Sequence, residues 1–384
     1  MNIYEQYNAY NIASICVMYL YIIDFILARQ KKVAISLALL VYHTLMAGLF
    51  YVDTLSEEYD SNYYYSEAIS QEDYMLGTYR HAVILLAKIL DILFGSYIGV
   101  FLSFSMFGYI GLYLCMMAIP KTASLSKKDY SMLKVLFLLP GLSYWTSGIG
   151  KDSITMLCFG LIVYGIANKK KLIPYLGVMI ELAFRTHFGL IFLFALTGAK
   201  IIPLKVGKRK SSQLLNAYLM LSLSIVIAVV ILYFKFGISS LNSLNQFRQE
   251  ALEYVAYGSL GARYQSLPDL IKPFAYLIYP ISPSGGGVMA MISLENVVIL
   301  SVVSVVVINM VQKRKKYLYL DNPVFVFGLV MLVVGLPVIA INEVNVGIML
   351  RQKWIFVLSV FLVYFTASRP RSRIGSTVMK RGDA

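Results

Sequence analysis

The stretch Tyr97–Ala118 has the sequence YIGVFLSFSMFGYIGLYLCMMA and contains no charged residue along its 22 positions. About 20 consecutive apolar residues in a helix are enough to cross the hydrocarbon core of a bilayer. The stretch is followed by a cluster of lysines, namely Lys121, Lys127, Lys128 and Lys134. Short loops rich in lysine and arginine are typical of the cytoplasmic side of a membrane. Tyr97–Ala118 is therefore predicted to be a transmembrane helix that ends in the cytoplasm.

Apolar stretches of this kind recur along the whole chain. Its 384 residues are 59% hydrophobic and 14% charged, whereas soluble domains average roughly 45–50% apolar and about 25% charged residues. We therefore expect an all-α fold, in which residues 1–384 form a single integral membrane domain of about eleven transmembrane helices. The predicted spans are Tyr10–Ala28, Val33–Val52, Tyr97–Ala118, Leu133–Ser147, Ser153–Ala167, Leu172–Phe184, His187–Leu204, Leu214–Phe234, Val288–Val311, Pro323–Ile341 and Ile348–Ala367.

The distribution of charge predicts how the bundle is oriented. The span Val33–Val52 follows a basic cluster at residues 29–32 and precedes an acidic segment at residues 53–73. Because basic loops stay inside, we expect the N-terminus outside and the basic C-terminus in the cytoplasm. Residues 53–96 then form an outer loop, with a helix along the membrane interface from His81 to Gly95. Residues 235–287 form a second, long outer loop.

The formal net charge of +14 is explained by the basic loops. The sequence has no basic helix and no basic stretch interleaved with aromatic residues, so we expect no nucleic acid partner. Cys16, Cys115 and Cys158 each lie within an apolar span and lack metal-ligand spacing. They are interpreted as small buried hydrophobic side chains, and no metal site is expected.

Ionisable residues on the outer half of the predicted bundle point to function, because a charge at membrane depth is costly unless it is paired or faces water. The first group is Trp145-Thr-Ser-Gly-Ile-Gly-Lys151-Asp152, at the tip of a hairpin between two spans. Its two glycines allow the backbone to turn, and Lys151 with the N-terminal amides of the next helix would bind an anion. The alternative is a Lys151–Asp152 surface pair that closes the hairpin.

The second group is Arg185-Thr-His187, at the tip of the following hairpin. Arg185 offers a planar fork of donors that suits a phosphate, and His187 is a candidate general base near neutral pH. The alternative is that Glu181, four residues earlier on the same helix face, simply neutralises Arg185.

Two further groups lie in the C-terminal third. Glu295, with Asn296 beside it, is a carboxylate within a predicted span, where it is either a general base or the structural partner of an arginine. The polar run Asn342–Gly347 leads to Arg351 on the expected outer side, where the orientation rule does not call for a cation.

The fifth group is Asp60 with Tyr63, Tyr64 and Tyr65 in the first outer segment. A carboxylate beside aromatic rings would bind a sugar; alternatively, the tyrosines belong to the aromatic belt common at membrane interfaces.

Taken together, these groups predict a positive cavity that opens to the outside. Lys151, Arg185 and Arg351 would line it, and Arg263 is available from the long outer loop. Such a cavity suits a lipid-linked phosphate or diphosphate, because cations stabilise the charge that develops on a departing diphosphate.

The segment Pro140–Asp152, PGLSYWTSGIGKD, resembles a signature of bacterial polysaccharide polymerase-like membrane proteins, the Wzy-type O-antigen and exopolysaccharide polymerases. Arg185-Thr-His187, the proline-rich segment before Glu295, and Asn345-Val-Gly leading to Arg351 follow in the same order as in that group. The resemblance covers most of the chain. The chain departs from the group at Thr186, where a proline is frequent, and at residues 281–285, where the group often has Phe-Pro-Trp.

The resemblance implies a GT-C-like helical fold in the bacterial cytoplasmic (inner) membrane. It implies transfer of a growing glycan from undecaprenyl diphosphate to a new lipid-linked repeat unit, without a metal, a nucleotide sugar or any other cofactor. The implied partners are undecaprenyl-diphosphate-linked oligosaccharide, membrane lipid, and a chain-length regulator and a flippase of the same pathway. The residues expected to bind diphosphate are Lys151, Arg185, Arg351 and Arg263. The expected catalytic residues are His187 or Glu295 as the base and Asp60 as the group that orients sugar, with sugar contacts from Trp145, Tyr64 and Asn345.

Three other functions stay open. A GT-C glycosyltransferase that uses a polyprenyl monophosphate sugar would carry an acidic pair in its first outer loop, where Asp60 lies among several acids. A transporter or flippase for lipid-linked glycans would show internal repeats and charges through the membrane depth, and the sequence has no clear repeat. The third alternative is a non-enzymatic assembly partner of a polysaccharide machine.

Overall fold

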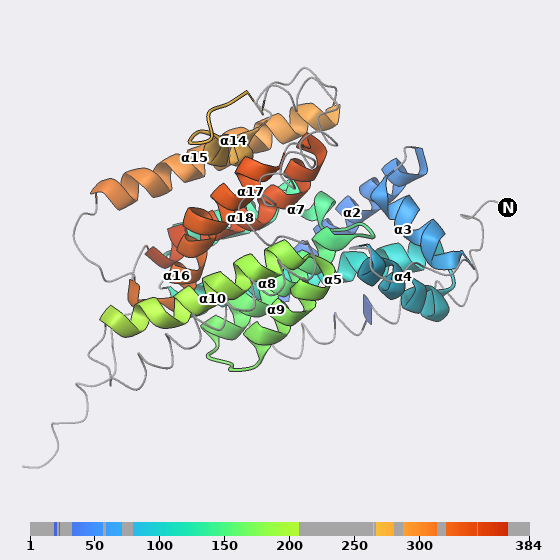
Figure 1. The fold of residues 1–384 in the computed structure, drawn as a ribbon, viewed down its shortest axis with the longest axis horizontal. Helices are drawn as coiled ribbons and strands as arrows, with labels where there is room; N and C mark the ends of the chain where they lie inside the picture. Colours follow the sequence, from blue (N-terminus) through green and yellow to red (C-terminus); the bar gives the residue numbers. More distant parts are fainter. Residues whose placement is uncertain are drawn as a thin grey trace, which may run out of the picture.

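The computed structural model describes residues 19–20, 23, 33–56, 59–70, 80–123, 125–206, 264, 266–279, 287–312, 320–343 and 345–367. Within these ranges the secondary structure is helical, without a β-strand. The predicted class, an all-α bundle, is therefore confirmed for the described part of the chain (Figure 1).

The helices differ widely in length. The first part of the bundle contains α2 (Val33–Ser56), α3 (Asp60–Ile69), α4 (His81–Phe94), α5 (Tyr97–Thr122), α6 (Lys127–Phe137), α7 (Pro140–Trp145), α8 (Lys151–Ala167), α9 (Ile173–Phe184) and α10 (Thr186–Val206). The second part contains α14 (Lys272–Ile278), α15 (Gly287–Gln312), α16 (Pro323–Val330), the π-helical turn η2 (Met331–Gly335), α17 (Leu336–Asn342) and α18 (Val346–Ala367).

Five described segments are long and apolar enough to cross a membrane: Ile35–Ser56, Tyr97–Thr122, Thr186–Pro203, Pro323–Asn342 and Val346–Ala367. Shorter apolar helices cover Ile173–Phe184 and Ile292–Val305. Most of the predicted span Tyr10–Ala28 and all of Leu214–Phe234 lie outside the described residues. The chain is thus a helical membrane bundle by composition and helix length, and the total of eleven spans stays a prediction.

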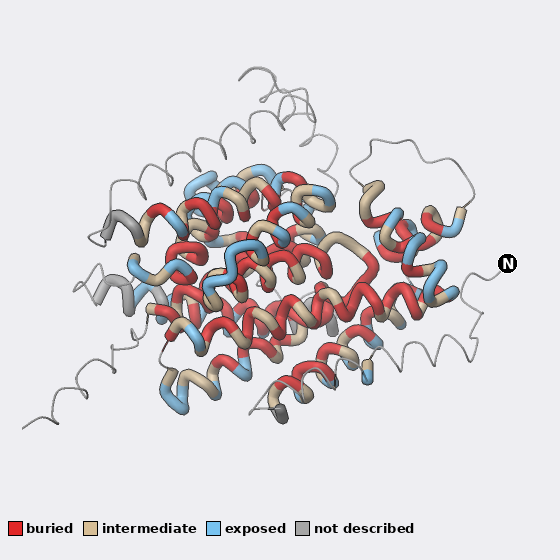
Figure 2. The backbone as a smooth tube through the Cα atoms, turned by 90° about the horizontal axis from the view of Figure 1, so that it is seen from below, coloured by how far each residue is buried: buried red, intermediate tan, exposed pale blue. Residues whose placement is uncertain are grey.

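Buried residues run through much of the bundle (Figure 2), yet many large apolar side chains of the described residues are exposed. Val41 in α2, Ile92 in α4 and Leu294 in α15 have 60%, 78% and 71% of their surface exposed. So many exposed large apolar side chains are unusual on a protein surrounded by water. It is what helices that face lipid require, because lipid tails are as apolar as these side chains.

The predicted span Leu133–Ser147 is wrong as a single helix. α6 ends at Phe137 and α7 begins at Pro140, in the first turn of the second helix. Proline fits this position because the first helical N–H groups have no acceptor within the helix. The break leaves α7 as a separate short helix, whose last residue, Trp145, lines the cavity described below.

α5 and α8 pack unusually closely because glycines lie at their contact. A Cβ atom added to Gly111 would lie 2.2 Å from the backbone oxygen of Met156, and one added to Gly160 would lie 2.4 Å from the backbone oxygen of Gly111. Small residues permit such close approach between membrane helices. This packing fixes α8, which begins with Lys151.

Helix ends from distant parts of the sequence meet at one end of the bundle. α2, α9 and α17 end there, and α3, α8, α10 and α18 begin there. The 17-residue α8 separates this end from the basic turn at Lys169–Lys171 by about 25 Å, given a rise of about 1.5 Å per residue. The fold therefore brings together the segments that the sequence analysis assigned to the outer side.

Candidate functional site

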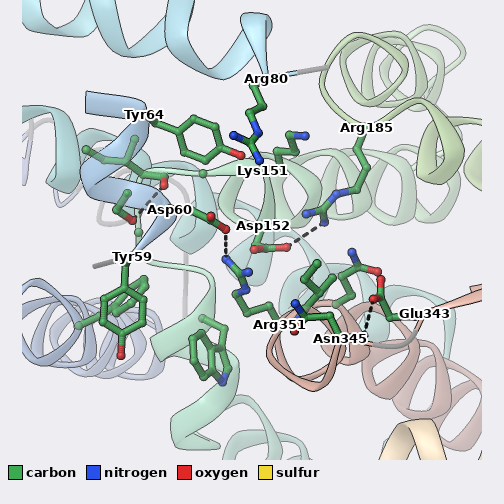
Figure 3. A pocket seen from close by; sticks show the side chains of 18 of the residues that line it. Tyr59, Asp60, Tyr64, Arg80, Lys151, Asp152, Arg185, Glu343, Asn345 and Arg351 are labelled. Atoms are coloured by element: carbon green, nitrogen blue, oxygen red, sulfur yellow. Dashed lines mark hydrogen bonds and ion pairs between the residues drawn. The ribbon is translucent and has the colours of Figure 1, made fainter. Parts of the chain in front are cut away.

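A cavity of about 590 Å³ lies where these helix ends meet (Figure 3). Its walls come from α2, α3, the connection between α7 and α8, the junction of α9 and α10, and the segment between α17 and α18. Segments separated by up to about three hundred residues thus share one space. The predicted site residues that line it are Asp60, Tyr64, Trp145, Lys151, Arg185, His187, Asn345 and Arg351.

Arg185 lies at the junction of α9 and α10, where the backbone leaves helical geometry with φ −145° and ψ 83°. Its Nη1 donates to Oδ1 of Asp152 in the first turn of α8, at 2.8 Å. The direct ion-pair partner of Arg185 is therefore Asp152 and not Glu181. Burial opposes the charge of Arg185, but the carboxylates of Asp152 and Glu181 outweigh this effect and raise the pKa of the guanidinium.

Arg351, in the second turn of α18, forms the second ion pair of the cavity. Its Nη1 donates to Oδ2 of Asp60 at 2.6 Å, and its Nε donates to the backbone oxygen of Gly347 at 3.3 Å. Asp60 is the first residue of α3, a position where the helix dipole favours a carboxylate. The Asp60 side chain is 52% exposed, so part of its carboxylate stays accessible from the cavity.

Lys151 begins α8, next to Asp152, and lines the same cavity. Burial and the nearby positive charge of Arg185 lower the pKa of its ammonium group to about 7, although Asp152 partly opposes the shift. At neutral pH Lys151 is therefore divided between its charged and neutral forms. An anion in the cavity would favour the charged form, because an opposite charge raises the pKa of a lysine.

Arg80 and Glu343 complete the charged lining, and neither was singled out as a site residue from the sequence. Arg80 precedes α4, and its guanidinium carbon lies 4.9 Å from the centre of the Tyr63 ring. Glu343 follows α17 and accepts a hydrogen bond from the backbone N–H of Asn345 at 3.0 Å. Arg80 is the first cation after the long acidic segment. This isolated positive charge on the expected outer side was the sequence feature that could have marked it as a site residue.

The charges in the cavity are close to balanced. The cations are Arg80, Lys151, Arg185 and Arg351, and the carboxylates are Asp60, Asp152 and Glu343. In Figure 3 the arginines point toward Asp60 and Asp152, which lie between them. The expectation of a simply positive cavity is therefore incomplete: ion pairs hold the cations in place, and an anion would have to compete with carboxylates.

Aromatic rings line another part of the cavity. Trp145 lies 5.8 Å from Phe50 between ring centroids, and Phe50 lies 5.3 Å from Tyr59. Tyr64 from α3 also lines this space. Flat apolar faces beside polar groups suit the alternating apolar and hydroxyl surfaces of a sugar ring.

Glu295 lies away from this cavity, within the bundle. Its Oε1 accepts a hydrogen bond from the backbone N–H of Gly141, at 2.5 Å, and the residue is 4% exposed. Nearby, Nζ of the buried Lys353 donates to Oδ1 of Asn296 at 2.5 Å. Glu295 therefore contacts the backbone of α7, and the ion pairs of the described residues do not join it to an arginine, the structural partner that was expected. Arg263, the fourth expected diphosphate ligand, lies outside the described residues.

Among the described residues, no three His, Cys, Asp or Glu side chains are grouped so that they could hold a metal ion. Comparison of the chain with models of protein families, with curated proteins and with solved structures finds no match. The chemistry of the cavity and the sequence motifs that line it are therefore the features that point to a function.

Proposed function

We propose that the protein is a membrane glycosyltransferase that acts as a polysaccharide polymerase. It transfers a glycan from undecaprenyl diphosphate onto a lipid-linked repeat unit at the outer face of the bacterial cytoplasmic membrane. The observation that carries the proposal is the convergence of Lys151, Arg185 and Arg351 on one cavity that also has an aromatic wall. This combination suits a ligand that is anionic at one end and a sugar at the other.

In the proposed reaction, a hydroxyl oxygen of the acceptor sugar forms a bond to the anomeric carbon of the donor glycan. The bond between that carbon and the diphosphate oxygen breaks, and the diphosphate leaves with the electron pair. Arg185, Arg351 and protonated Lys151 would stabilise the charge that grows on the leaving group. A leaving diphosphate needs no proton, so the base is required only for the acceptor hydroxyl.

Asp60 and His187 are the proposed acceptors of the hydroxyl proton, because both line the cavity. Glu295 is not retained in this role, since its contacts lie with Gly141 and not with the cavity. In the structure the carboxylate of Asp60 is paired with Arg351. When the diphosphate of the donor binds Arg351 in place of Asp60, the carboxylate of Asp60 becomes available to accept a proton.

Deletion of the gene, followed by gel analysis of surface glycan, tests this function. A polymerase defect leaves single repeat units on the lipid carrier, whereas a flippase defect leaves the units trapped inside the membrane. Extracts that add one sugar at a time, without a ladder, would instead indicate a glycosyltransferase that uses polyprenyl monophosphate sugars. Full restoration of the ladder by Arg185→Ala or Arg351→Ala, at normal protein abundance, would rule out the assigned site.

A further inference from the structure

Arg185 has two hydrogen-bonding partners that differ in kind. Its Nη1 lies 2.8 Å from Oδ1 of Asp152 and 3.5 Å from Oγ1 of Thr155. The hydroxyl of Thr155 donates in turn to Oε1 of Glu181, at 2.7 Å. A hydroxyl has one proton and two lone pairs. Because the proton is directed to Glu181, a lone pair of Thr155 is left to accept from Arg185.

The two partners also differ in their access to the cavity. Asp152 lines the cavity, and its side chain is 13% exposed. Thr155 and Glu181 do not line the cavity and are 1% and 0% exposed. An anion that enters the cavity can therefore reach Arg185 on the side of Asp152, while the side of Thr155 stays closed to it.

The complete burial of Glu181 points to a specific role for this side chain, because an ionisable group buried in a membrane helix is costly. Glu181 lies in α9, one turn before Arg185, and Thr155 lies in α8, one turn after Lys151. The contact between Thr155 and Glu181 therefore joins the two helices whose ends supply two of the cations of the cavity, Lys151 and Arg185. The same contact orients the Thr155 hydroxyl so that one of its lone pairs faces the guanidinium of Arg185.

We propose that Glu181, acting through Thr155, is a positioning residue that holds Arg185 in the cavity wall, whereas Asp152 is a temporary partner that a bound phosphate replaces. This inference rests on the proposed phosphate site. On this view Arg185 keeps one hydrogen-bonding partner throughout a binding cycle, so the guanidinium stays oriented when Asp152 is displaced.

The test compares variants of Thr155 in the full-length protein, purified in detergent, with inorganic diphosphate as the probe. Thr155→Val keeps the shape of the side chain and removes the hydroxyl, whereas Thr155→Ser keeps the hydroxyl and removes the methyl group. We expect Thr155→Val to weaken diphosphate binding about tenfold and Thr155→Ser to stay within about twofold of the native protein. A role in packing alone would give the opposite order, since valine would fill the space and serine would not.

Two further variants sharpen the comparison. Glu181→Ala should weaken binding as much as Thr155→Val, and the double variant should be no weaker than either, because both changes break the same chain of contacts. Asp152→Asn removes a competing negative charge and should bind diphosphate several-fold more tightly. Equal affinity for the native protein, Thr155→Val and Glu181→Ala, with binding lost only in Arg185→Ala, would overturn the inference and leave the phosphate site intact.

A second measurement separates this inference from the proposed function. The rate at which phenylglyoxal, a reagent for arginine, modifies Arg185 can be followed by peptide mass spectrometry without any ligand. Loss of the fixed partner should increase this rate several-fold in Thr155→Val and not in Thr155→Ser. If the native protein fails to bind diphosphate, the proposed function fails, and this rate alone decides the role of Glu181 and Thr155. An unchanged rate in Thr155→Val would then refute it.

Discussion

Arg351 in α18 donates to Asp60 in α3 with an Nη1–Oδ2 distance of 2.6 Å, although 291 positions separate the two residues in the sequence. Their side chains are 24% and 52% exposed, so solvent screens the pair. Ion pairs of this kind contribute about 1 kcal/mol or less to folding. The contact is therefore better suited to holding Arg351 at the cavity than to stabilising the bundle.

Exchange of the two residues, Asp60→Arg with Arg351→Asp, distinguishes a role of the pair in positioning the cation from a role in stabilising the fold. The pair is kept, but the cation moves from α18 to the exposed start of α3. We expect a thermal unfolding midpoint within a few degrees of the native value, because the pair contributes little to stability. Polymer synthesis should nevertheless be lost, as judged by the glycan ladder in a deletion strain. A normal ladder from the exchanged protein would show that the position of the cation is unimportant.

Lys151 should make diphosphate binding depend on pH. Its pKa is lowered to about 7 by burial and by Arg185, and a bound anion raises it again. The protein therefore takes up about half a proton on binding at pH 7, and close to one proton at higher pH until the raised pKa of the complex is reached. Affinity is highest below pH 7 and falls as the pH rises, by up to about fifty-fold between pH 7 and pH 9, as the protonated fraction drops.

Lys151→Arg provides the control for this pH dependence, because a guanidinium stays charged over the whole range. Titration of diphosphate itself affects both proteins equally, so the ratio of their dissociation constants isolates Lys151. The measurement is isothermal titration calorimetry in buffers of different ionisation enthalpy, which also counts the protons taken up. A constant ratio from pH 6 to pH 9 would contradict the lowered pKa.

Much of this architecture could be predicted from the sequence, because the features that define each helix lie within or next to that helix. The apolar composition of Tyr97–Thr122 and Val346–Ala367 is local, and so are the capping residues Ser96 and Asn345, which directly precede these helices. The positions of the hairpin tips followed from the same pattern, and so the residues Lys151 and Arg185 could be named as neighbours. The break before α7 was missed because the apolar character continues through Leu138 and Leu139, and only Pro140 marks the boundary.

The pairing of charges could not be predicted in the same way. Glu181 lies one helical turn before Arg185 and was the obvious local partner, yet Arg185 pairs with Asp152 across the packed helices α8 and α9. The Asp60–Arg351 contact depends on the position of α3, which no local pattern specifies. For Glu295 the sequence left two interpretations, a general base or the partner of an arginine, and neither anticipated its contact with the backbone N–H of Gly141, 154 positions away.

Substitution of Trp145 should affect glycan transfer more than diphosphate binding. The ring lies in the aromatic part of the cavity, against Phe50 and Tyr144. Trp145→Ala should therefore lower the rate of glycan transfer about fivefold, since a stacked aromatic contact contributes about 1 kcal/mol, while diphosphate affinity stays within about twofold. Trp145→Phe keeps a flat ring and should recover most of the transfer rate. Equal loss of both properties in Trp145→Ala would show that the two parts of the cavity are not separate.

Gly141 should be intolerant of even one methyl group, which tests the structural role of Glu295. A Cβ atom at this position would lie 2.5 Å from Oε2 of Glu295 and 2.6 Å from Cζ2 of Trp354, and both side chains are buried. Gly141→Ala should thus destabilise the bundle by about 1–3 kcal/mol, the usual cost of an overpacked core. Gly48→Ala is the matched control, because nothing lies within 4 Å of its added Cβ atom and alanine favours the helix. Unfolding midpoints in detergent measure both changes.

Glu295→Gln should unfold near the native midpoint in the same assay, because the amide oxygen can accept from the Gly141 N–H. It should also still build a glycan ladder in a deletion strain. A stable Glu295→Gln protein without a ladder would return Glu295 to the role of general base.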